Sequence, residues 1–303
     1  TDGDIRRAIL RGCDLAAPTA DVMNCSPTTA PANLASNELL ALMRRKRLHH
    51  LPLLNNEMHV VGLSTLVELT GASERPNWVV LMAGGLGSRL MPLTESCPKP
   101  MLQVGGKPIL ESILESFSEQ GFRKFFLSVN YLAQSIRDHF GDGSQWGVDI
   151  SYLQEDKRLG TAGALSLLPE RPSDPLVVMN GDLLTRVHFE SMLNFHFERG
   201  AVATMAVREY DFQVPYGVVR LNGPNIAAIE EKPVHHFFVN AGIYTLSPEA
   251  FEHIPTGTSF DMPTLFETLL AGGHPTSAYP LREHWLDIGR LEELERAQKE
   301  WKF

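Results

Sequence analysis

Short apolar runs alternate with longer stretches of helix-spaced apolar residues throughout residues 77–303. The short runs predict buried strands at residues 79–82, 125–130, 148–153, 176–179 and 201–207. The longer stretches predict helices between them, at residues 108–120, 132–140, 161–168 and 188–199. Further strands are predicted at residues 218–221, 226–230 and 238–246, and late helices at 261–270 and 291–301. This alternation is typical of an α/β fold with a doubly wound, mostly parallel sheet.

Residues 1–71 have a different pattern and predict a small α+β domain. Helices are predicted at residues 4–11 and 36–47, and the second ends in basic residues, which suit a helix C-terminus. Strands are predicted at 50–54 and 59–63, and Ser64 can cap a short helix that runs to residue 69. Gly and Pro punctuate a polar linker at 72–76, so we expect the larger domain at 77–303.

The composition limits the partners that this chain can have. A hydrophobic share of 43% and a charged share of 21% are those of a globular protein. No apolar run approaches the ~20 residues that span a bilayer, and a net charge of −9 argues against nucleic acid, so neither a membrane nor a nucleic-acid partner is expected. The three cysteines form no disulfide framework and no signal peptide is visible, so we expect a cytoplasmic protein.

The strand predicted at 79–82 leads into a loop of small and basic residues. Small side chains leave the backbone N–H groups uncovered, and such groups can bind a phosphate or meet a base. The small residues are Ala83, Gly84, Gly85, Gly87 and Ser88. Arg89 and Lys99 add positive charge close behind them. We interpret this segment as a nucleotide-binding loop at the carboxyl end of a strand, and a tight turn without a ligand is the alternative.

Two better-known phosphate loops do not fit this segment. A Walker loop needs Gly-Lys followed by Ser or Thr, but Pro108 follows Gly106-Lys107. A dinucleotide fingerprint needs a third glycine at the position that Leu90 occupies.

Two acids are the candidate metal ligands. Asp182 follows the strand at 176–179 and is expected at the sheet edge that faces a nucleotide crevice, although Asn180-Gly181-Asp182 also suits an ordinary turn. Asp287, in Trp285-Leu286-Asp287-Ile288-Gly289, is the second acid, with helix capping as its alternative. Triphosphate chemistry needs Mg²⁺, which prefers one or two carboxylates with water in the other positions.

The motif G-G-x-G-S-R-L-x-P-L-T, followed by P-K-P-M, resembles the signature of the sugar-1-phosphate nucleotidyltransferases. The resemblance covers roughly residues 77 to 303 and is greatest to the mannose-1-phosphate guanylyltransferase-like branch. It implies a Rossmann-like nucleotidyltransferase fold and a reaction between an NTP and a sugar-1-phosphate, with GTP favoured. It also implies that Asp182 and Asp287 share a magnesium ion.

The resemblance assigns roles to further residues. Catalysis falls to Arg89, Lys99 and Asp182. The nucleotide-binding set is Ala83, Gly84, Gly85, Gly87, Ser88, Arg89, Gln154, Gly160, Thr161 and Asp182. The set for the sugar phosphate is Lys99, Gly163, Glu231, Lys232, Asn240 and Gly242. Without the resemblance, Gly160 to Gly163 would be a tight connection, and Glu231-Lys232 would be ordinary solvated surface.

The N-terminal β-β-α order resembles a cystathionine-β-synthase-type (CBS) domain, a module that often binds adenine nucleotides. Thr1-Asp2-Gly3-Asp4 fits the second half of that family's ligand motif, and Val67 stands where the second copy needs an acid. We therefore expect one full motif and the tail of another, with the strand before Thr1 outside this chain. CBS modules often pair, which makes a homo-oligomer an expected partner state.

Three functions remain open from the sequence. The first is direct attack of the sugar-1-phosphate on the α-phosphorus of the NTP, with positioning and charge stabilisation as the main sources of catalysis. The second is a non-catalytic nucleotide-sugar-binding regulator. The third is a regulatory protein in which the CBS region senses an adenine nucleotide.

Overall fold

The structure is a computed structural model that describes residues 2–14, 17–46, 48–66, 69 and 74–301. The helix predicted at 64–69 and the linker predicted at 72–76 fall partly outside these residues. Ser64 and Thr65 belong to a strand, because their backbone pairs with Leu51 and His50, and helix is present at Leu66 and Leu69. No helix in the described ranges combines the length and the apolar character needed to cross a membrane.

A mixed sheet of seven strands forms the centre of the molecule, in the order β15-β11-β14-β9-β4-β7-β8. The strands are β4 (Val79–Met82), β7 (Lys124–Val129), β8 (Asp149–Gln154), β9 (Leu176–Asn180), β11 (Ala203–Gln213), β14 (Val234–Leu246) and β15 (Thr276–Pro280). β9, β4, β7 and β8 are parallel neighbours, as are β11 and β15. β14 alone runs antiparallel to both of its neighbours in this sheet. The predicted mostly parallel α/β sheet is therefore confirmed, with β14 as the exception.

The direction of strand addition reverses beside β4. β7 and β8 extend the sheet on one side of β4, and β9 continues it on the other side. Loops that leave the carboxyl ends of β4 and β9 therefore diverge, which opens a crevice where α/β sheets bind ligands. Gly181 keeps the two strand ends close, since a Cβ on it would lie 2.8 Å from the Met82 carbonyl oxygen.

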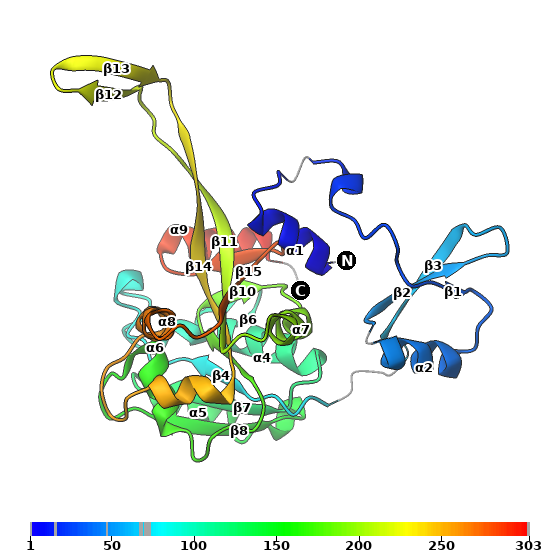
Figure 1. The fold of residues 1–303 in the computed structure, drawn as a ribbon. Helices are drawn as coiled ribbons and strands as arrows, with labels where there is room; N and C mark the ends of the chain where they lie inside the picture. The colour runs from blue at the N-terminus through cyan, green and yellow to red at the C-terminus, as the bar shows by residue number, and fades with distance from the viewer. Residues whose placement is uncertain (1, 15–16, 47, 67–68, 70–73, 302–303) are drawn as a thin grey trace.

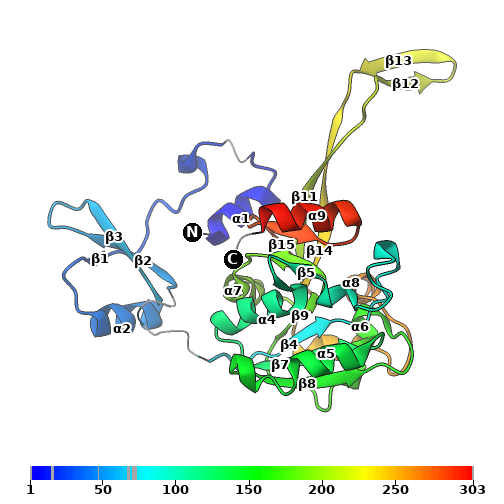
Figure 2. The ribbon, with the colours of Figure 1, turned by 180° about the vertical axis from the view of Figure 1, so that it is seen from behind.

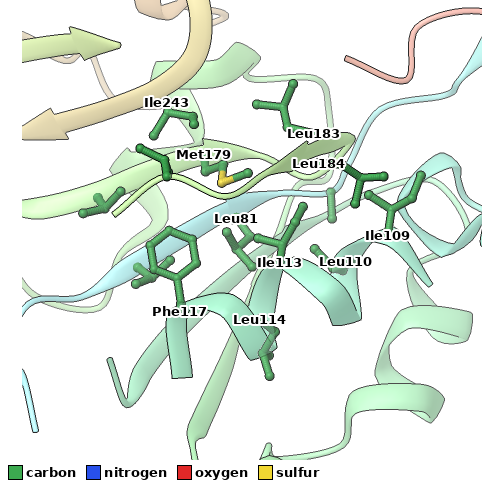
Figure 3. Close-up of a cluster of buried hydrophobic side chains, with 14 of the residues drawn as sticks. Leu81, Ile109, Leu110, Ile113, Leu114, Phe117, Met179, Leu183, Leu184 and Ile243 are labelled. Atoms are coloured by element: carbon green, nitrogen blue, oxygen red, sulfur yellow. The ribbon is translucent and has the colours of Figure 1, made fainter. Parts of the chain in front are cut away.

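Helices cover both faces of the sheet, because alternate strand residues point to opposite sides. Leu81, Met179 and Ile243 face α4 (Figure 3) and belong to the larger core cluster. Val80 and Val178 face the other way, into the cluster that contains α8. The helices are α4 (Ile109–Glu119), α5 (Ala133–Phe140), α7 (Phe189–Arg199) and α9 (Leu291–Glu300) on the first face, and α6 (Gly160–Gly163) and α8 (Met262–Ala271) on the second.

Shorter elements complete the body. Two small antiparallel pairs are β5 (Gln103–Val104) with β6 (Lys107–Pro108), and β10 (Leu183–Thr185) with β16 (Trp285–Asp287). The 3-10 segments are Thr19–Asp21, Ser88–Leu90, Lys99–Met101, Ser144–Trp146, Ala164–Leu167 and Pro248–His253. The helix predicted at 161–168 is divided into α6 and a 3-10 segment, because the amides of Ala162 and Gly163 bond to the Phe260 carbonyl.

The outer halves of β11 and β14 leave the body as a two-stranded ribbon. The ribbon continues into the hairpin of β12 (Val218–Asn222) and β13 (Asn225–Glu230). Figures 1 and 2 show this projection standing clear of the other elements. Its residues are exposed, whereas the inner halves of both strands are buried in the sheet.

The N-terminal segment contains a small module with its own sheet and core. β1 (Ala30–Pro31), β2 (His50–Leu54) and β3 (Val60–Thr65) form the sheet, and α2 (Ser36–Lys46) packs on it. The core residues are Ala30, Leu39, Met43 and Leu51. Glu190 of α7 links the body to this module, because its carboxylate pairs with His49 and with Arg75. Hydrogen bonding from His49 and from Arg75 lowers the pKa of the Glu190 carboxyl to about 2.

Helix α1 (Asp2–Leu10) packs on the body at β15 and α7 and lies apart from β1–β3 (Figure 1). Arg6 on this helix is fully buried. Its Nη2 donates to Glu283 Oε1 at 2.8 Å, and its guanidinium carbon lies 3.6 Å from the ring centre of Tyr279. A buried cation needs such partners, so Arg6 is the main polar anchor of α1.

Replacing Arg6 by Ala should release α1 from the body. The change removes the ring stacking and leaves the half-buried Glu283 without this cation, so we expect the docked state to lose about 2–4 kcal/mol. Hydrogen exchange of the amides of residues 2–10 measures this loss. Arg7→Ala is the matched control, because the Arg7 side chain is 42% exposed and its pairs with Asp4 at 2.6 Å and with the exposed Glu198 at 3.8 Å should each contribute below ~1 kcal/mol. Equal protection in both variants would contradict the anchoring role of Arg6.

Candidate functional site

A cavity of about 380 Å³ lies at the carboxyl ends of β4 and β9. The glycine-rich loop after β4 forms one wall, and the segments that follow β8 and β9 form the others. The lining residues are Met82, Gly84, Gly85, Leu86, Gly87, Ser88, Arg89, Leu90, Lys99, Glu155, Arg158, Gly160, Thr161, Asn180, Asp182 and Gly289. The predicted crevice therefore exists, and the chain brings most of its basic loop to it.

The bend of the glycine-rich loop depends on two of its glycines. Gly87 has φ +63°, and a Cβ on it would lie 2.8 Å from Thr94 Cγ2. A Cβ on Gly84 would lie 2.9 Å from Glu155 Oε1. Gly85 faces open space instead, so its backbone stays accessible from the cavity. Ala83 is buried and its amide donates a hydrogen bond to the Ser128 carbonyl, so it supports the loop and its N–H is not available to a ligand.

Asp182 and Asp287 come together through the small β10–β16 sheet. Leu183 pairs with Asp287 across this sheet, and the Ile288 amide donates to the Asp182 carbonyl at 3.0 Å. Lys99, which is itself buried, forms an ion pair with the Asp182 carboxylate. The two acids therefore lie on neighbouring segments, and Asp182 lines the cavity whereas Asp287 lies just outside the lining.

The surroundings of Asp287 disfavour the ionised form of its carboxyl. Burial raises the pKa of its carboxyl, and the neighbouring Asp182 raises it further. Lys99 and Arg89 lower the pKa and so offset part of this effect. The side chains of Arg89 and Asp287 both approach Gly289. A Cβ on Gly289 would be 3.6 Å from Arg89 Nη1 and 3.7 Å from Asp287 Oδ1. A cation between the carboxylates would relieve their repulsion.

The donor set fits a hard divalent cation that keeps most of its water. Among the described residues, no group of three or more His, Cys, Asp or Glu side chains could hold a metal. Two carboxylates remain, which is the number that Mg²⁺ commonly takes from a protein when water and phosphate supply the other ligands.

Asn180 carries a buried acceptor at the cavity wall. Its Oδ1 has no hydrogen-bond partner among the described residues, which is costly unless a ligand donates to it. Gly242 packs behind it with φ +72°, and a Cβ there would lie 2.7 Å from Asn180 Nδ2. Asn240 holds this turn by accepting from the Gly242 amide at 2.9 Å. Asn240 and Gly242 therefore support the wall from outside the lining.

The segment after β8 is held by polar bonds to the start of α8. The Thr161 amide donates to Asp261 Oδ1 at 3.0 Å, and Thr161 Oγ1 accepts from the Met262 amide at 2.8 Å. Gly160, with φ +76°, must stay a glycine because a Cβ would lie 2.7 Å from the Phe260 carbonyl oxygen. These bonds present Gly160 and Thr161 to the cavity.

Several predicted residues do not line the cavity. Gly163 is buried against the Thr258 carbonyl. Gln154 is exposed on β8, where its Oε1 accepts from Arg137 at 3.2 Å. Glu231 and Lys232 lie on the projecting ribbon. Their assignments to the base and to the sugar phosphate stay predictions.

Seven lining residues lie outside the assigned sets, and three of them, Glu155, Arg158 and Asn180, have polar side chains. Glu155 is buried and accepts from Ser128 Oγ at 2.6 Å and from the Leu159 amide at 2.9 Å. Arg158 adds a further cation, and Asn180 adds the unsatisfied acceptor described above. Asn180 directly follows the strand predicted at 176–179, Glu155 lies two residues after the strand predicted at 148–153, and Arg158 lies two residues before Gly160. These positions are the signal that could have identified them.

Comparison with known proteins gives a consistent result. The sequence model of a family described as "Nucleotidyl transferase" matches residues 78–302. The chain is 34% identical over 239 residues to a UTP–glucose-1-phosphate uridylyltransferase of Synechocystis sp., covering 72% of this chain and 61% of that protein. It is 33% identical over 225 residues to a mannose-1-phosphate guanylyltransferase catalytic subunit beta of Danio rerio, covering 71% and 62%. The chain thus spans about three fifths of the length of the curated relatives it matches.

Solved structures agree with the observed fold. HddC from Yersinia pseudotuberculosis superposes with a TM-score of 0.59 at 27% identity, covering 75% of this chain and 100% of that chain. The same protein complexed with GMP-PN gives a TM-score of 0.58 at 25% identity and the same coverage.

Lys99→Met should destabilise the fold in chelator-treated buffer. Without the ammonium, Asp182 and Asp287 face each other with less compensation, so we expect the free energy of unfolding to fall by about 1–3 kcal/mol. Adding Asp182→Asn to this variant should recover much of the loss, because it removes one of the repelling charges. Denaturant titration of the wild type, both single variants and the double variant measures this coupling.

Lys107→Met is the control for the lost ammonium. Lys107 pairs with Glu115 at 2.6 Å, but both side chains are about one third exposed, so the loss should stay below ~1 kcal/mol. An Asp182→Asn effect that is the same with and without Lys99 would show that the two groups are not coupled.

Proposed function

The chain belongs to the nucleotidyl transferase family, and we propose that it transfers a nucleoside monophosphate from an NTP to a sugar-1-phosphate, releasing pyrophosphate and forming an NDP-sugar. The observation that carries this proposal is the cavity walled by a glycine-rich loop, which Arg89, Lys99 and Asp182 line and beside which Asp287 is held by strand pairing. A single phosphate-binding turn would need no such pair of acids.

In the proposed reaction, a phosphate oxygen of the sugar-1-phosphate attacks the α-phosphorus of the NTP and pyrophosphate leaves. The attacking oxygen is already ionised near neutral pH, so no protein nucleophile is needed. Two polyanions at ~4 Å repel by several kcal/mol at an effective dielectric near 20, and this repulsion is the main obstacle. Arg89, Lys99 and Arg158 on the cavity wall oppose it with fixed positive charge.

Asp182 and Asp287 would hold Mg²⁺, which when bound supplies positive charge to the phosphate oxygens. The protein's own contribution is to keep both carboxylates in register through β10 and β16, and Lys99 fixes the Asp182 side chain. Arg89 is proposed to stabilise the departing pyrophosphate. The glycine-rich loop, together with Gly160 and Thr161, is proposed to bind the nucleotide.

We propose GTP as the nucleotide. Relatives named as guanylyltransferases and the HddC complex with GMP-PN support this choice, while the Synechocystis relative is named for UTP. The base is proposed to meet Gln154. The sugar phosphate is proposed to meet Glu231, Lys232, Asn240, Gly242 and Gly163. A regulator that binds a nucleotide sugar without turnover would not need the full set of Arg89, Lys99, Asp182 and Asp287.

A second proposal concerns the N-terminal segment, which we infer to be a partial CBS module that binds an adenine nucleotide. A cavity of about 260 Å³ beside α1 supports it. Apolar side chains such as Ile5, Ile9 and Met23 line this cavity together with Asp4 and Arg282, a mixture that suits a flat base with a polar sugar.

Turnover should require both the acid pair and a divalent ion. A pyrophosphate-release screen of the four NTPs against a panel of sugar-1-phosphates, with Mg²⁺, should give one preferred pair that includes GTP. In that assay Asp182→Asn should lower kcat by about 10²-fold or more, because the charge that organises the phosphates is lost. Asp138→Asn on exposed α5 is the control and should turn over normally. Undiminished rates in Asp182→Asn, or in excess chelator, would exclude this mechanism.

Binding of AMP to the full chain tests the second proposal. Asp4→Asn should weaken AMP binding about tenfold, the equivalent of one charge-assisted hydrogen bond, as calorimetry can measure. Asp182→Asn should leave AMP affinity unchanged, because that site lies in the other cavity. The adenine-nucleotide proposal fails if wild type binds no AMP, or if Asp182→Asn abolishes binding.

A further inference from the structure

The buried carboxylate of Glu155 has no task in the reaction above, unlike the other charged side chains on the described lining of the cavity. Glu155 lines the cavity and is only 9% exposed. Among the described residues, its side chain bonds to neutral groups and forms no ion pair with a Lys or Arg. A buried charge without a cation is destabilising. Stability alone therefore does not account for a carboxylate at this position.

Hydrogen bonds fix the orientation of the Glu155 side chain. Ser128 Oγ donates to Oε1 at 2.6 Å, and the Leu159 amide donates to Oε2 at 2.9 Å. The backbone is fixed as well, because the Glu155 amide donates to the Val129 carbonyl at 3.0 Å and its carbonyl accepts from Asn130 Nδ2 at 2.7 Å. A carboxylate offers about four acceptor positions, so each oxygen retains one for a ligand.

A glutamine would satisfy the same neighbours of residue 155 without the charge. Its amide oxygen could accept from the Leu159 amide, and its NH₂ group could donate to the Ser128 hydroxyl, which can accept as well as donate. The bonds within the protein therefore do not require a carboxylate. The negative charge and the second acceptor oxygen are what a glutamine lacks, so these are the properties that a ligand would use.

The glycine-rich loop leaves this carboxylate accessible. A Cβ on Gly84 would lie 2.9 Å from Glu155 Oε1, so a larger residue at 84 would press on this oxygen. Gly85 has open space where its side chain would be, and both glycines line the cavity. Gly160 lines it from the segment after β8. Small residues on two sides allow a flat ring to approach the carboxylate closely.

The sheet order separates Glu155 from the residues that are proposed to hold the phosphates. Asp182 follows β9, whereas the Glu155 carboxylate bonds to Ser128 on β7, and the strand order is β9-β4-β7. Neighbouring strands are ~4.8 Å apart, so two spacings separate these points by about 10 Å. A nucleotide spans a similar length from its α-phosphate to the outer edge of its base. Because an unpaired carboxylate repels phosphates, the uncharged base is the part of the nucleotide that suits this end.

The hydrogen-bond donors of the base decide which nucleotide a carboxylate prefers. Guanine carries two adjacent donors, N1–H and the N2 amino group, and a carboxylate can accept from both at once. Uracil and thymine carry a single N3–H between two carbonyl oxygens, which a carboxylate repels. Adenine and cytosine carry one amino group beside a ring nitrogen that is itself an acceptor. Among these bases, guanine alone therefore makes a bidentate pair with a carboxylate.

We propose that Glu155 selects guanine by accepting hydrogen bonds from N1–H and the N2 amino group of the base. The inference rests on the proposed function, because it gives a structural reason for GTP as the substrate. Of the two neighbours Gln154 and Glu155, only Glu155 belongs to the described lining of the cavity, so Glu155 is the one that decides between bases. It acts on specificity and not on the reacting phosphates.

Calorimetric titration of the full chain, with Mg²⁺ and without a sugar phosphate, tests this selection. Wild type should bind GTP at least about 100-fold more tightly than UTP. Inosine triphosphate lacks only the N2 amino group and should bind with an intermediate affinity, because one of the two bonds is lost. Glu155→Gln should weaken GTP binding about 100-fold and change UTP binding by less than about threefold.

Pyrophosphate binding shows whether Glu155→Gln keeps an intact cavity. Pyrophosphate carries the charge of the substrate but no base, so its affinity should be the same in this variant and in wild type. Glu111→Gln is the matched control for a lost carboxylate. The Glu111 side chain is 17% exposed, pairs with His139 at 2.7 Å and lies outside the cavity lining. This control should leave GTP and UTP binding unchanged.

Three results would overturn the selection of guanine by Glu155. They are equal weakening of GTP and UTP in Glu155→Gln, a loss of pyrophosphate binding as large as the loss of GTP binding, and equal affinities of wild type for inosine triphosphate and GTP. Gln154→Ala tests the neighbouring side chain. If this variant, and not Glu155→Gln, removes the preference for GTP, the deciding contact lies at 154 and the inference is wrong.

Pyrophosphate release with a panel of sugar-1-phosphates separates this inference from the proposed function. If wild type prefers GTP in the titrations but releases no pyrophosphate with any sugar, the proposed function fails and the role of Glu155 stands. If wild type turns over UTP and binds GTP no better than UTP, nucleotidyl transfer stands and the role of Glu155 fails.

Discussion

The site depends on one electrostatic arrangement: two carboxylates held together and only partly compensated by Lys99. Like charges at short range are costly in a partly buried place, so the backbone must impose their proximity. Here the β10–β16 pairing and the bond from the Ile288 amide to the Asp182 carbonyl impose it. The repulsion between the two carboxylates favours the binding of a cation beside them. A triphosphate substrate needs such a cation to offset its own negative charge.

The sheet order explains why these residues can meet at all. Asp182 follows β9, and the glycine-rich loop follows β4, its parallel neighbour at the point where strand addition reverses. Asp287 arrives from the opposite end of the chain, on a short strand that is not part of the central sheet. Arg6 contacts Glu283 on the same connection between β15 and β16, so the N-terminal helix and the second acid share one structural support. A change in the packing of α1 can therefore reach Asp287 through the few residues that separate it from Glu283.

Local pattern predicted the central strands and the loop after β4, because each of these follows from a buried run that ends in small or polar residues, whereas the meeting of the two acids was implied by the family resemblance. It did not predict that β14 runs antiparallel, since direction depends on partners far away in sequence. Gly163 was expected at the ligand but is buried, because a small residue suits close packing as well as close approach to a ligand. The hairpin of β12 and β13 was predicted, but residues 208–213 and 234–237 were not predicted as strands, because a ribbon that leaves the body lacks the buried apolar run on which the prediction depends.

The lining of the cavity comes from one part of the central sheet. Its described lining residues come from the segments after β4, β8 and β9, from Lys99 and from Gly289, and β11 and β14 contribute none. β14 is the next strand beyond β9, and its Gly242 lies against Asn180, whose buried Oδ1 has no donor in the part of the chain that the structure describes. A reaction between two phosphates gains most when water is excluded from fixed charges. Asn180 and the turn at Gly242 therefore form the boundary between the cavity and the strands that continue into the projecting ribbon.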